Sequence, residues 1–318
     1  MTNNNDKLLI FAGLIPNRPG GVGIHVNRLM DYLELHNIPF TLANYENENS
    51  IKLAKAIRRA KVVHLHISNP VMQFMTTVFC RFLGKKTIVT LHGNYGRFSN
   101  IKNWMVRCTL RLATVPVVIN QTSYEQCHSL NKRMRLIPAF IPPQKEEKLQ
   151  LEIEQLLSDI HKKGQLIVST NAYDFAYDKE GKEIYGISFL IDYFRNDPKY
   201  ALLISDPSGN YSKKYQRGNS IYLIGYPHSY FELLKQADIF VRNTSTDGDS
   251  VSVKESLSLA KPTLCSDAVD RPQGVITFKY SDKLSFEESL KKIGATPVVH
   301  MEDAAADIVD IYKDYIEF

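Results

Sequence analysis

Short apolar runs rich in β-branched residues alternate with stretches of helical periodicity along the sequence. Continuous apolar runs of this length are typical of strands that a parallel sheet buries on both faces. Strands that alternate with helices form βαβ units with right-handed crossovers. We therefore predict an α/β protein built on parallel sheets. The predicted strands are Leu8–Ala12, Phe40–Ala43, Val62–Ile67, Thr87–Leu91, Val117–Asn120, Arg135–Pro138, Leu166–Ser169, Ala201–Ser205, Ile221–Ile224, Ile239–Arg242 and Thr263–Cys265.

The alternation pauses once, near the middle of the 318 residues, a length that favours two domains. Ile141-Pro142-Pro143 precedes a run of mixed charge, which marks a linker or the entry to a surface helix. We predict two Rossmann-like domains, 1–142 and 143–318, whose strand ends face a central, ligand-binding cleft. The sequence leaves open whether the last helix, Asp303–Ile316, packs on the first domain. The other predicted helices are Val22–Leu35, Ile51–Ala60, Val71–Leu83, Trp104–Leu112, Gly186–Phe194, Tyr230–Gln236, Val251–Ala260 and Leu284–Ile293.

The composition excludes several classes of protein. Apolar residues make up 44% and charged residues 23%, as in ordinary globular proteins. No apolar run approaches the ~18 residues of a membrane span, and the N-terminal residues do not resemble a signal peptide. The four cysteines lie far apart without CxxC spacing, against a disulfide framework or a zinc site. We expect a cytoplasmic protein with no metal and no bound cofactor.

Charge is divided unevenly between the two halves. Residues 1–150 contain 20 Lys and Arg against 8 Asp and Glu, whereas residues 151–318 contain 19 against 26. Such asymmetry suggests that the basic half faces an anionic surface, although two domains with different surfaces would show it too. Nucleic acid is a weaker option for this partner, because no recognised binding module appears.

Two segments of the first half combine glycine or histidine with a strand end. Gly20-Gly21 precedes a predicted helix, where glycine allows close approach of an anionic ligand to unpaired N–H groups. A tight strand-to-helix turn explains the same glycines equally well, and Val26 replaces the third glycine of a dinucleotide fingerprint. His92 follows a predicted strand, where open α/β sheets place functional side chains. His64 and His66 lie within a strand and are expected to pack.

A third segment, Ile239–Glu255, is the most specific. A buried strand ends in a polar loop, and a helix begins near Asp249 or Ser250, both good N-cap residues. Gly248 and the N–H groups of the first helical turn, at Ser250, Val251 and Ser252, are suited to a phosphate. Arg242 at the strand end offers a charge-assisted partner to the same phosphate. Glu255 can accept hydrogen bonds from a ribose or sugar diol; a helix whose acidic residues merely favour its dipole is the alternative.

These residues resemble retaining glycosyltransferases of the GT-B fold, of family four in the sugar-transferase classification. Asp247 and Glu255 have the spacing of the family's E-x7-E signature, with Asp in place of the first Glu. The segment that follows resembles the family's EAMASGKPVIASD, and Ala237–Val241 resembles its ADVFV strand. Gly20-Gly21 and His92 fall in the family's order, so the resemblance covers nearly the whole chain.

The resemblance implies transfer of a sugar from a nucleotide-diphosphate donor, with retention and without metal, and we expect this donor to be a UDP-sugar. It implies that Glu255 holds the donor ribose, that Asp247 holds the sugar hydroxyls, and that the Ser250–Ser252 amides hold the diphosphate. His92 would lie near the sugar and the acceptor, with Asn94 and Tyr95 on the acceptor side. Gly20 and Gly21 would line the donor site, and we include Asn171 in it.

The sequence departs from the family at the diphosphate. The family's GRL…KG segment supplies an Arg and a Lys, but the corresponding stretches here read Ser169-Thr170-Asn171-Ala172 and Tyr185-Gly186. We predict that Arg242, alone or together with Lys254, replaces this charge. A subunit that binds the donor or acts as a scaffold without turnover is an alternative, and an NAD-dependent oxidoreductase is a further one.

Two stretches of the basic half combine apolar and basic residues at helical spacing, Val71–Lys86 and Lys102–Arg111. Such helices can lie on an anionic membrane, with aromatic residues at the headgroup level. Packing in the core is the alternative. It is the favoured interpretation for the first stretch, and for the second, which contains the only Trp, the two interpretations are about equally favoured. Because related enzymes build lipid-linked polysaccharides, we expect a lipid-linked saccharide acceptor and a peripheral location on the inner membrane face.

Overall fold

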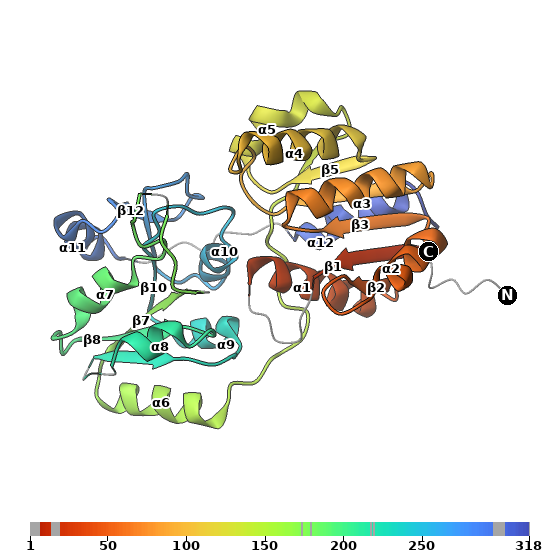
Figure 1. Cartoon of the computed structure of the whole chain (residues 1–318). Coiled ribbons are helices and arrows are strands. Elements are labelled where there is room, and N and C mark those ends of the chain that lie inside the picture. The colour runs from red at the N-terminus through yellow and green to blue at the C-terminus, as the bar shows by residue number, and fades with distance from the viewer. Residues whose placement is uncertain are drawn as a thin grey trace. The chain divides into compact units, whose positions relative to one another are not determined.

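The chain divides into two compact units, Met1–Lys145 with Glu302–Phe318, and Glu146–Met301, called here the N-terminal and C-terminal units. Each contains a parallel sheet of six strands, shown in red to yellow and in green to blue in Figure 1. The structure is a computed structural model that describes residues 7–13, 20–172, 174–178, 180–216, 218, 220–294 and 303–317.

The sheet of the N-terminal unit has the strand order β2-β1-β3-β4-β5-β6. Its strands are β1 (Leu8–Ala12), β2 (Thr41–Asn44), β3 (Val62–His66), β4 (Lys86–Leu91), β5 (Val115–Val118) and β6 (Arg135–Leu136). Its helices are α1 (Gly21–Leu35), α2 (Ser50–Arg59), α3 (Pro70–Phe82), α4 (Asn100–Leu112), α5 (Gln121–Cys127), the short 3-10 helix η2 (His128–Leu130) and α12 (Ala304–Lys313).

The central strand β1 shows why its apolar run is unbroken. Leu8 and Ile10 point into a core formed with α1 and α12, whereas Leu9 and Phe11 point into a second core formed with α2 and α3. Both faces of the strand are therefore covered, as the sequence pattern predicts. The packing of Ile308 in the first core places α12 in the N-terminal unit, where the sequence left its position open.

The sheet of the C-terminal unit has the strand order β12-β11-β10-β7-β8-β9. Its strands are β7 (Leu166–Asn171), β8 (Tyr200–Ser205), β9 (Ile221–Ile224), β10 (Ile239–Arg242), β11 (Thr263–Ser266) and β12 (Ile276–Phe278). One face packs against α7 and α11, and the other against α6, α9 and α10. These helices are α6 (Leu151–Lys162), α7 (Ile187–Phe194), α8 (Asn210–Lys214), α9 (Tyr230–Lys235), α10 (Val251–Ser258) and α11 (Lys283–Lys291).

The structure differs from the predicted elements mainly in short segments. The predicted strand Val117–Asn120 is shifted to Val115–Val118, because Pro116 fits the strand and Asn120 caps α5 through a bond from the Ser123 N–H. The helices α5, α6 and α8 and the strand β12 were not predicted. The helices α5 and α8 and the strand β12 are short, and α6 follows the charged run that the sequence marks as a linker or the entry to a surface helix. The alternation of strands and helices itself is confirmed.

Candidate functional site

The candidate site of the C-terminal unit lies where β10 leads into α10. β10 ends at Arg242, and α10 begins at Val251 after a polar loop. Ser250 is the N-cap residue, but its hydroxyl lies 3.2 Å from that of Ser252 and makes no capping bond. The first N–H groups of a helix have no partner within the helix and carry partial positive charge. This end of α10 is therefore suited to an anionic group.

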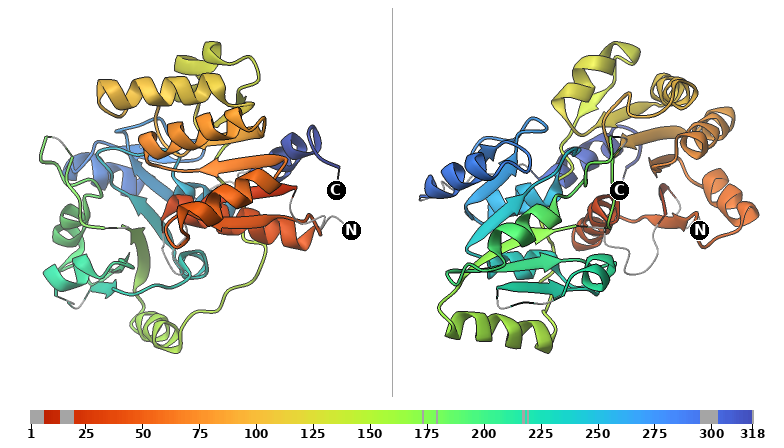
Figure 2. Two further views of the ribbon diagram at one scale, coloured as in Figure 1. Left: turned by 45° about the vertical axis from the view of Figure 1, so that its right-hand side comes forward. Right: turned by 60° about the vertical axis from the view of Figure 1, so that its left-hand side comes forward.

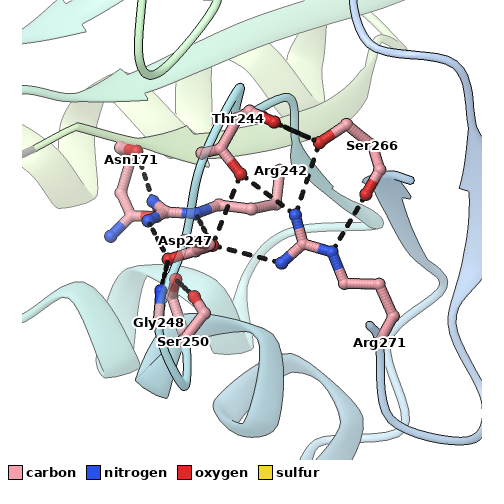
Figure 3. Close-up of polar contacts among 9 residues, drawn as sticks. Asn171, Arg242, Thr244, Asp247, Gly248, Ser250, Ser266 and Arg271 are labelled. Carbon is pink, nitrogen blue, oxygen red and sulfur yellow. Dashed lines mark hydrogen bonds and ion pairs between the residues drawn. The ribbon is translucent and has the colours of Figure 1, made fainter. Parts of the chain in front are cut away.

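Asp247 lies between two arginines (Figure 3). Arg242 donates from Nε and Nη2 to the two carboxylate oxygens, at 3.1 and 3.3 Å. Arg271 donates from Nη1 to Oδ2 at 3.1 Å. The Thr244 hydroxyl and the Gly248 N–H also donate to the carboxylate, at 3.4 and 3.1 Å. These four donors fix the orientation of the carboxylate.

Asp247 and Arg242 remain ionised although they are buried. Burial alone would raise the pKa of Asp247, but the ion pairs with Arg242 and Arg271 outweigh it and hold that pKa below its usual value. Burial likewise opposes the charge of Arg242, and the pair with Asp247 raises its pKa. Two guanidinium groups thus share one carboxylate, and this group of three side chains has a net positive charge.

Arg242 also contacts one residue in each of the two stretches that the sequence analysis compares with the diphosphate segment of the resembled family. Its Nη1 donates to the backbone and side-chain oxygens of Asn171, at the end of β7, at 3.1 and 3.2 Å. Its guanidinium lies 5.1 Å from the ring centroid of Tyr185, within the range of a cation–π contact. Asn171 belongs to the stretch that corresponds to the family's Arg, and Tyr185 to its Lys. One guanidinium from β10 therefore lies beside both substituted positions.

Glu255 is buried on the second turn of α10. Burial raises the pKa of Tyr230, and the charge of Glu255 raises it further. Lys254 pairs with Asp249 at 2.5 Å, and both side chains are largely buried. Lys254 thus has a carboxylate of its own, whereas Arg242 shares the single carboxylate of Asp247 with Arg271, so the charge of Arg242 is the less fully matched of the two.

In the N-terminal unit, His92 belongs to a cluster of four histidines. His66, the last residue of β3, has its Nδ1 2.8 Å from Nε2 of His92, which follows β4. The ring of His25, on α1, lies 5.1 Å from that of His92, and the ring of His64 lies 4.0 Å from that of His66. His66 therefore contacts the predicted site residue directly, in addition to packing in the sheet.

Three of the four histidines, His64, His66 and His92, are kept neutral by burial. Burial lowers the pKa of His64, His66 and His92 well below the usual value, and neighbouring histidines lower it further. Ring nitrogens of His25, His66 and His92 lie within 4.8 Å of one another, close enough to consider a metal ion. The 2.8 Å contact of His66 with His92 is shorter than the roughly 3.3 Å between nitrogen ligands around tetrahedral zinc. The geometry describes a hydrogen-bonded pair of neutral rings.

The two predicted glycines begin α1. Gly20 is its N-cap residue with φ −128°, and Gly21 is its first residue. An added Cβ at Gly21 would meet no atom of the described residues within 4 Å. An extended φ is open to any residue, and Gly21 has room for a methyl group. Neither the backbone nor the packing of the described part of the chain therefore explains why glycine occupies these positions.

The loop after β4 is hydrogen-bonded to the start of α5 through the two predicted acceptor residues themselves. Asn94 accepts a hydrogen bond at Oδ1 from Asn120, the N-cap residue of α5, at 3.1 Å. The Tyr95 N–H donates to the Ser123 hydroxyl at 3.0 Å. These bonds fix the loop that also contains His92.

The predicted site residues thus fall into one group in each unit. Four residues of these groups were not predicted as site residues: His25, His64, His66 and Arg271. His66 is detectable in principle, because it ends a strand that pairs with the one that His92 follows. Arg271 has no local motif, since it joins Asp247 only through the loop after β11. The predicted residues are Gly20, Gly21, His92, Asn94 and Tyr95 in the N-terminal unit, and Asn171, Arg242, Asp247, Gly248, Ser250, Val251, Ser252 and Glu255 in the C-terminal unit.

Comparison with known proteins identifies the class of fold. The sequence matches no family model and no curated protein. The structure, in contrast, is similar over 97% of the chain to solved proteins of the GT-B fold, with two Rossmann-like α/β domains. At this low sequence identity the similarity establishes the fold.

Three of these solved structures are named here. Anabaena HepE in complex with UDP and glucose has 12% identity and a TM-score of 0.68, over 97% of this chain and 95% of HepE. Sucrose-phosphate synthase from Thermosynechococcus elongatus has 13% identity and a TM-score of 0.66, over 97% and 98% of the two chains. The lipopolysaccharide outer core galactosyltransferase WaaB has 12% identity and a TM-score of 0.52, over 96% and 94%.

Proposed function

We propose that this protein is a retaining, metal-independent glycosyltransferase that moves a sugar from a UDP-sugar to a saccharide acceptor. The observation that carries the proposal is the position of Arg242, beside both residues that replace the cations of the resembled family. The fold is shared with HepE, which was solved with UDP and with UDP-glucose. A sugar transferase of this type requires a cation at the diphosphate, and Arg242 provides one.

The proposed chemistry places charge stabilisation at the leaving diphosphate. Negative charge develops there as the glycosidic bond breaks, and donors held ready around it lower the barrier without a strong base. Arg242, the Gly248 region and the first turn of α10 are the groups that meet this charge. Glu255 accepts hydrogen bonds from the donor ribose. The Asp247 carboxylate already accepts from Arg242, Arg271, Thr244 and Gly248, so it holds Arg242 in place and does not bind the sugar hydroxyls expected of it. His92, kept neutral by burial, contacts the sugar without adding a charge.

The proposed acceptor is lipid-linked, and the N-terminal unit supplies a surface for a membrane. Helix α3 exposes an apolar stripe and buries its polar Gln73 and Thr77, the reverse of ordinary core packing. The most exposed member, Phe82, is 85% accessible, and Trp104 on the neighbouring α4 is 57% accessible. The two helices lie side by side in Figures 1 and 2. The stripe comprises Val71, Met75, Val78, Phe79 and Phe82.

The charge of this region favours an anionic membrane over a protein partner of mixed charge. Residues 49–124 contain 12 Lys and Arg and no Asp or Glu. Arg81, Lys102 and Arg107 are exposed on α3 and α4 next to the apolar residues. Basic residues near an anionic bilayer contribute about 1 kcal/mol each, and exposed aromatic residues insert at its interface. Among the described residues, no helix is long and apolar enough to span a bilayer. We propose peripheral binding at the cytoplasmic face.

The transferase proposal is tested by thermal stabilisation against UDP, GDP, UDP-sugars and NAD in EDTA. A ligand at a hundredfold excess over its dissociation constant adds about 2.7 kcal/mol of stability. We expect a shift with UDP-sugars that is lost in Glu255→Ala, and retained anomeric configuration in the product by NMR. A shift with NAD alone would favour the oxidoreductase. Donor binding without hydrolysis or transfer would favour the scaffold.

The membrane proposal is tested by co-sedimentation with vesicles of phosphatidylglycerol or of phosphatidylcholine. We expect binding to the anionic vesicles that falls with salt, and Phe82→Ser to weaken it about tenfold, as loss of one inserted aromatic residue should. Leu284→Ser is the matched control, an apolar residue 72% exposed in the C-terminal unit. Equal binding by both variants, or equal affinity for both vesicles, would contradict the proposal.

A further inference from the structure

Arg271 is held in place by three separate groups of the C-terminal unit. Its Nε donates to the Ser266 carbonyl at 3.0 Å, and its Nη2 donates to the Thr244 and Ser266 hydroxyls at 3.0 and 3.3 Å. Its Nη1 reaches Asp247, and only 4% of the side chain is exposed. Figure 3 shows this guanidinium on the opposite side of Asp247 from Arg242. An arginine fixed in this way belongs to the architecture of the site.

The charge balance around Arg271 requires an explanation. Taking a guanidinium out of water is costly unless an anion compensates it. Asp247 provides one negative charge for two arginines, all three side chains being at most 10% exposed. The group therefore has one more positive than negative charge. An anionic ligand beside these side chains would complete the balance.

We propose that Arg271 is the second cation of the donor diphosphate site and positions Asp247 within it. The inference rests on the proposed function, since the resembled family uses two cations, Arg and Lys, at this diphosphate. Arg242 lies beside both substituted positions, but it brings one charge and shares it with Asp247. With Arg271, the site again contains two cations. Together with the single carboxylate of Asp247 they give a net positive charge, which attracts the diphosphate.

The type of side chain matters as much as its charge. A guanidinium is a planar fork that can donate to three different acceptors at once, and here it joins the loop after β10 to the end of β11. A lysine would keep the charge but could not make the same set of bonds. Arg271 thus acts on the ligand mainly through its charge and through the position of Asp247, without need of direct contact.

The test measures binding of inorganic pyrophosphate, UDP and uridine to the full chain by calorimetry, without metal. In Arg271→Gln we expect pyrophosphate and UDP to bind about tenfold more weakly, because one positive charge near the anion is lost and Asp247 loses a partner, with uridine unchanged. Arg271→Lys should recover part of this affinity and the salt dependence of UDP binding. Arg195→Gln, which removes an exposed arginine of the same unit, should change UDP binding less than twofold.

The outcomes separate this inference from the proposed function. Unchanged pyrophosphate and UDP binding in Arg271→Gln would overturn the inference, even if the wild type transfers sugar. Equal weakening of uridine and UDP would also overturn it, because that result indicates structural damage. In the active enzyme, Arg271→Gln should raise KM for the donor more than it lowers kcat. Pyrophosphate binding that depends on Arg271, without any sugar transfer, would support the inference while refuting the transferase.

Discussion

Both units have buried ionisable groups near the carboxyl ends of parallel strands. These groups are neutral in the N-terminal unit and charged in the C-terminal unit. His66 and His92 lie at the ends of β3 and β4 and are neutral. Arg242 and Asp247 lie at and just beyond the end of β10 and are charged. The difference shows that burial alone does not decide the charge of a group. A counter-ion does, and in the C-terminal unit Asp247 provides one.

The surfaces of the units differ in the same direction. The N-terminal unit contains a region without any acidic residue, and α3 and α4 expose apolar side chains there. The segment 151–318, most of which forms the C-terminal unit, is acidic, although Arg242 and Arg271 give its candidate site a local positive charge. We infer that the first surface serves a membrane and the second site a small anion.

The strongest way to break this comparison is to remove the counter-ion. Asp247→Ala leaves Arg242 and Arg271 buried without their shared carboxylate. We expect the free energy of unfolding of the C-terminal unit to fall by about 3–5 kcal/mol, as when one partner of a buried pair is removed. Urea unfolding followed by hydrogen exchange measures it.

The control for this variant is Asp192→Ala, which removes an exposed partner of Arg195. It should change stability by no more than about 0.5 kcal/mol. Added pyrophosphate should restore part of the stability of Asp247→Ala, because it binds the two uncompensated arginines. A variant as stable as the wild type would show that the carboxylate is not the required counter-ion.

The second prediction compares the units by their response to pH. The folded pKa of His64, His66 and His92 is lowered, so their stability contribution is complete above the unfolded pKa of about 6.5 and is lost as the pH falls below it. Each adds up to about 1.4 kcal/mol per pH unit. Asp247, also with a lowered pKa, contributes fully above about 3.9 and loses its contribution only below that.

Hydrogen exchange measured between pH 7.5 and 4.5 reports each unit separately. Protection of β3 and β4 should decline below pH 6.5, whereas protection of β10 should decline less steeply. The C-terminal unit has one histidine with a pKa lowered by burial, His228, so its decline in this range is not zero. Equal slopes in the two units would contradict the assignment of neutral histidines to the N-terminal one.

The smallest effect on stability is expected at Gly21, where the two interpretations of the glycine pair diverge. Gly21→Ala should be neutral or stabilise by about 0.4–1 kcal/mol, because the backbone accepts alanine and its Cβ has room. If a ligand approaches this backbone, transfer activity should nevertheless fall severalfold. Gly164→Ala is the counterpart: its φ of +68° makes alanine costly by about 1 kcal/mol, with activity unchanged. Full activity of Gly21→Ala would exclude close approach of a ligand to this backbone and would favour a tight strand-to-helix turn as the role of the glycines.

The sequence predicts what local pattern determines. The unbroken apolar run of β1 and the passage from a buried strand through a polar loop to α10 require only neighbouring residues, and both are found. Arg242 is identifiable for the same reason. Its contacts with Asn171 and Tyr185 are not, because they join segments about 60 to 70 residues apart. Arg271 is not identifiable for the same reason, because its partners Thr244 and Asp247 follow a different strand, β10.

The helix α3 shows a different limit. Its apolar residues have ordinary helical spacing, and the pattern favours burial. The structure exposes that stripe and buries the polar side, in part because Gln73 donates to the Ile67 carbonyl and the Thr77 hydroxyl donates to the Gln73 carbonyl. Periodicity identifies an amphipathic helix but not which face the sheet covers.

The proposed function depends most on Arg242 as the cation that replaces those of the resembled family. Calorimetry of UDP and of uridine with the wild type and with Arg242→Gln, in EDTA, tests this directly. We predict that the wild type binds UDP without metal, and that the variant binds it about a hundredfold more weakly while its affinity for uridine is unchanged. UDP binding that is equal in the two proteins, or absent from the wild type, would contradict the account.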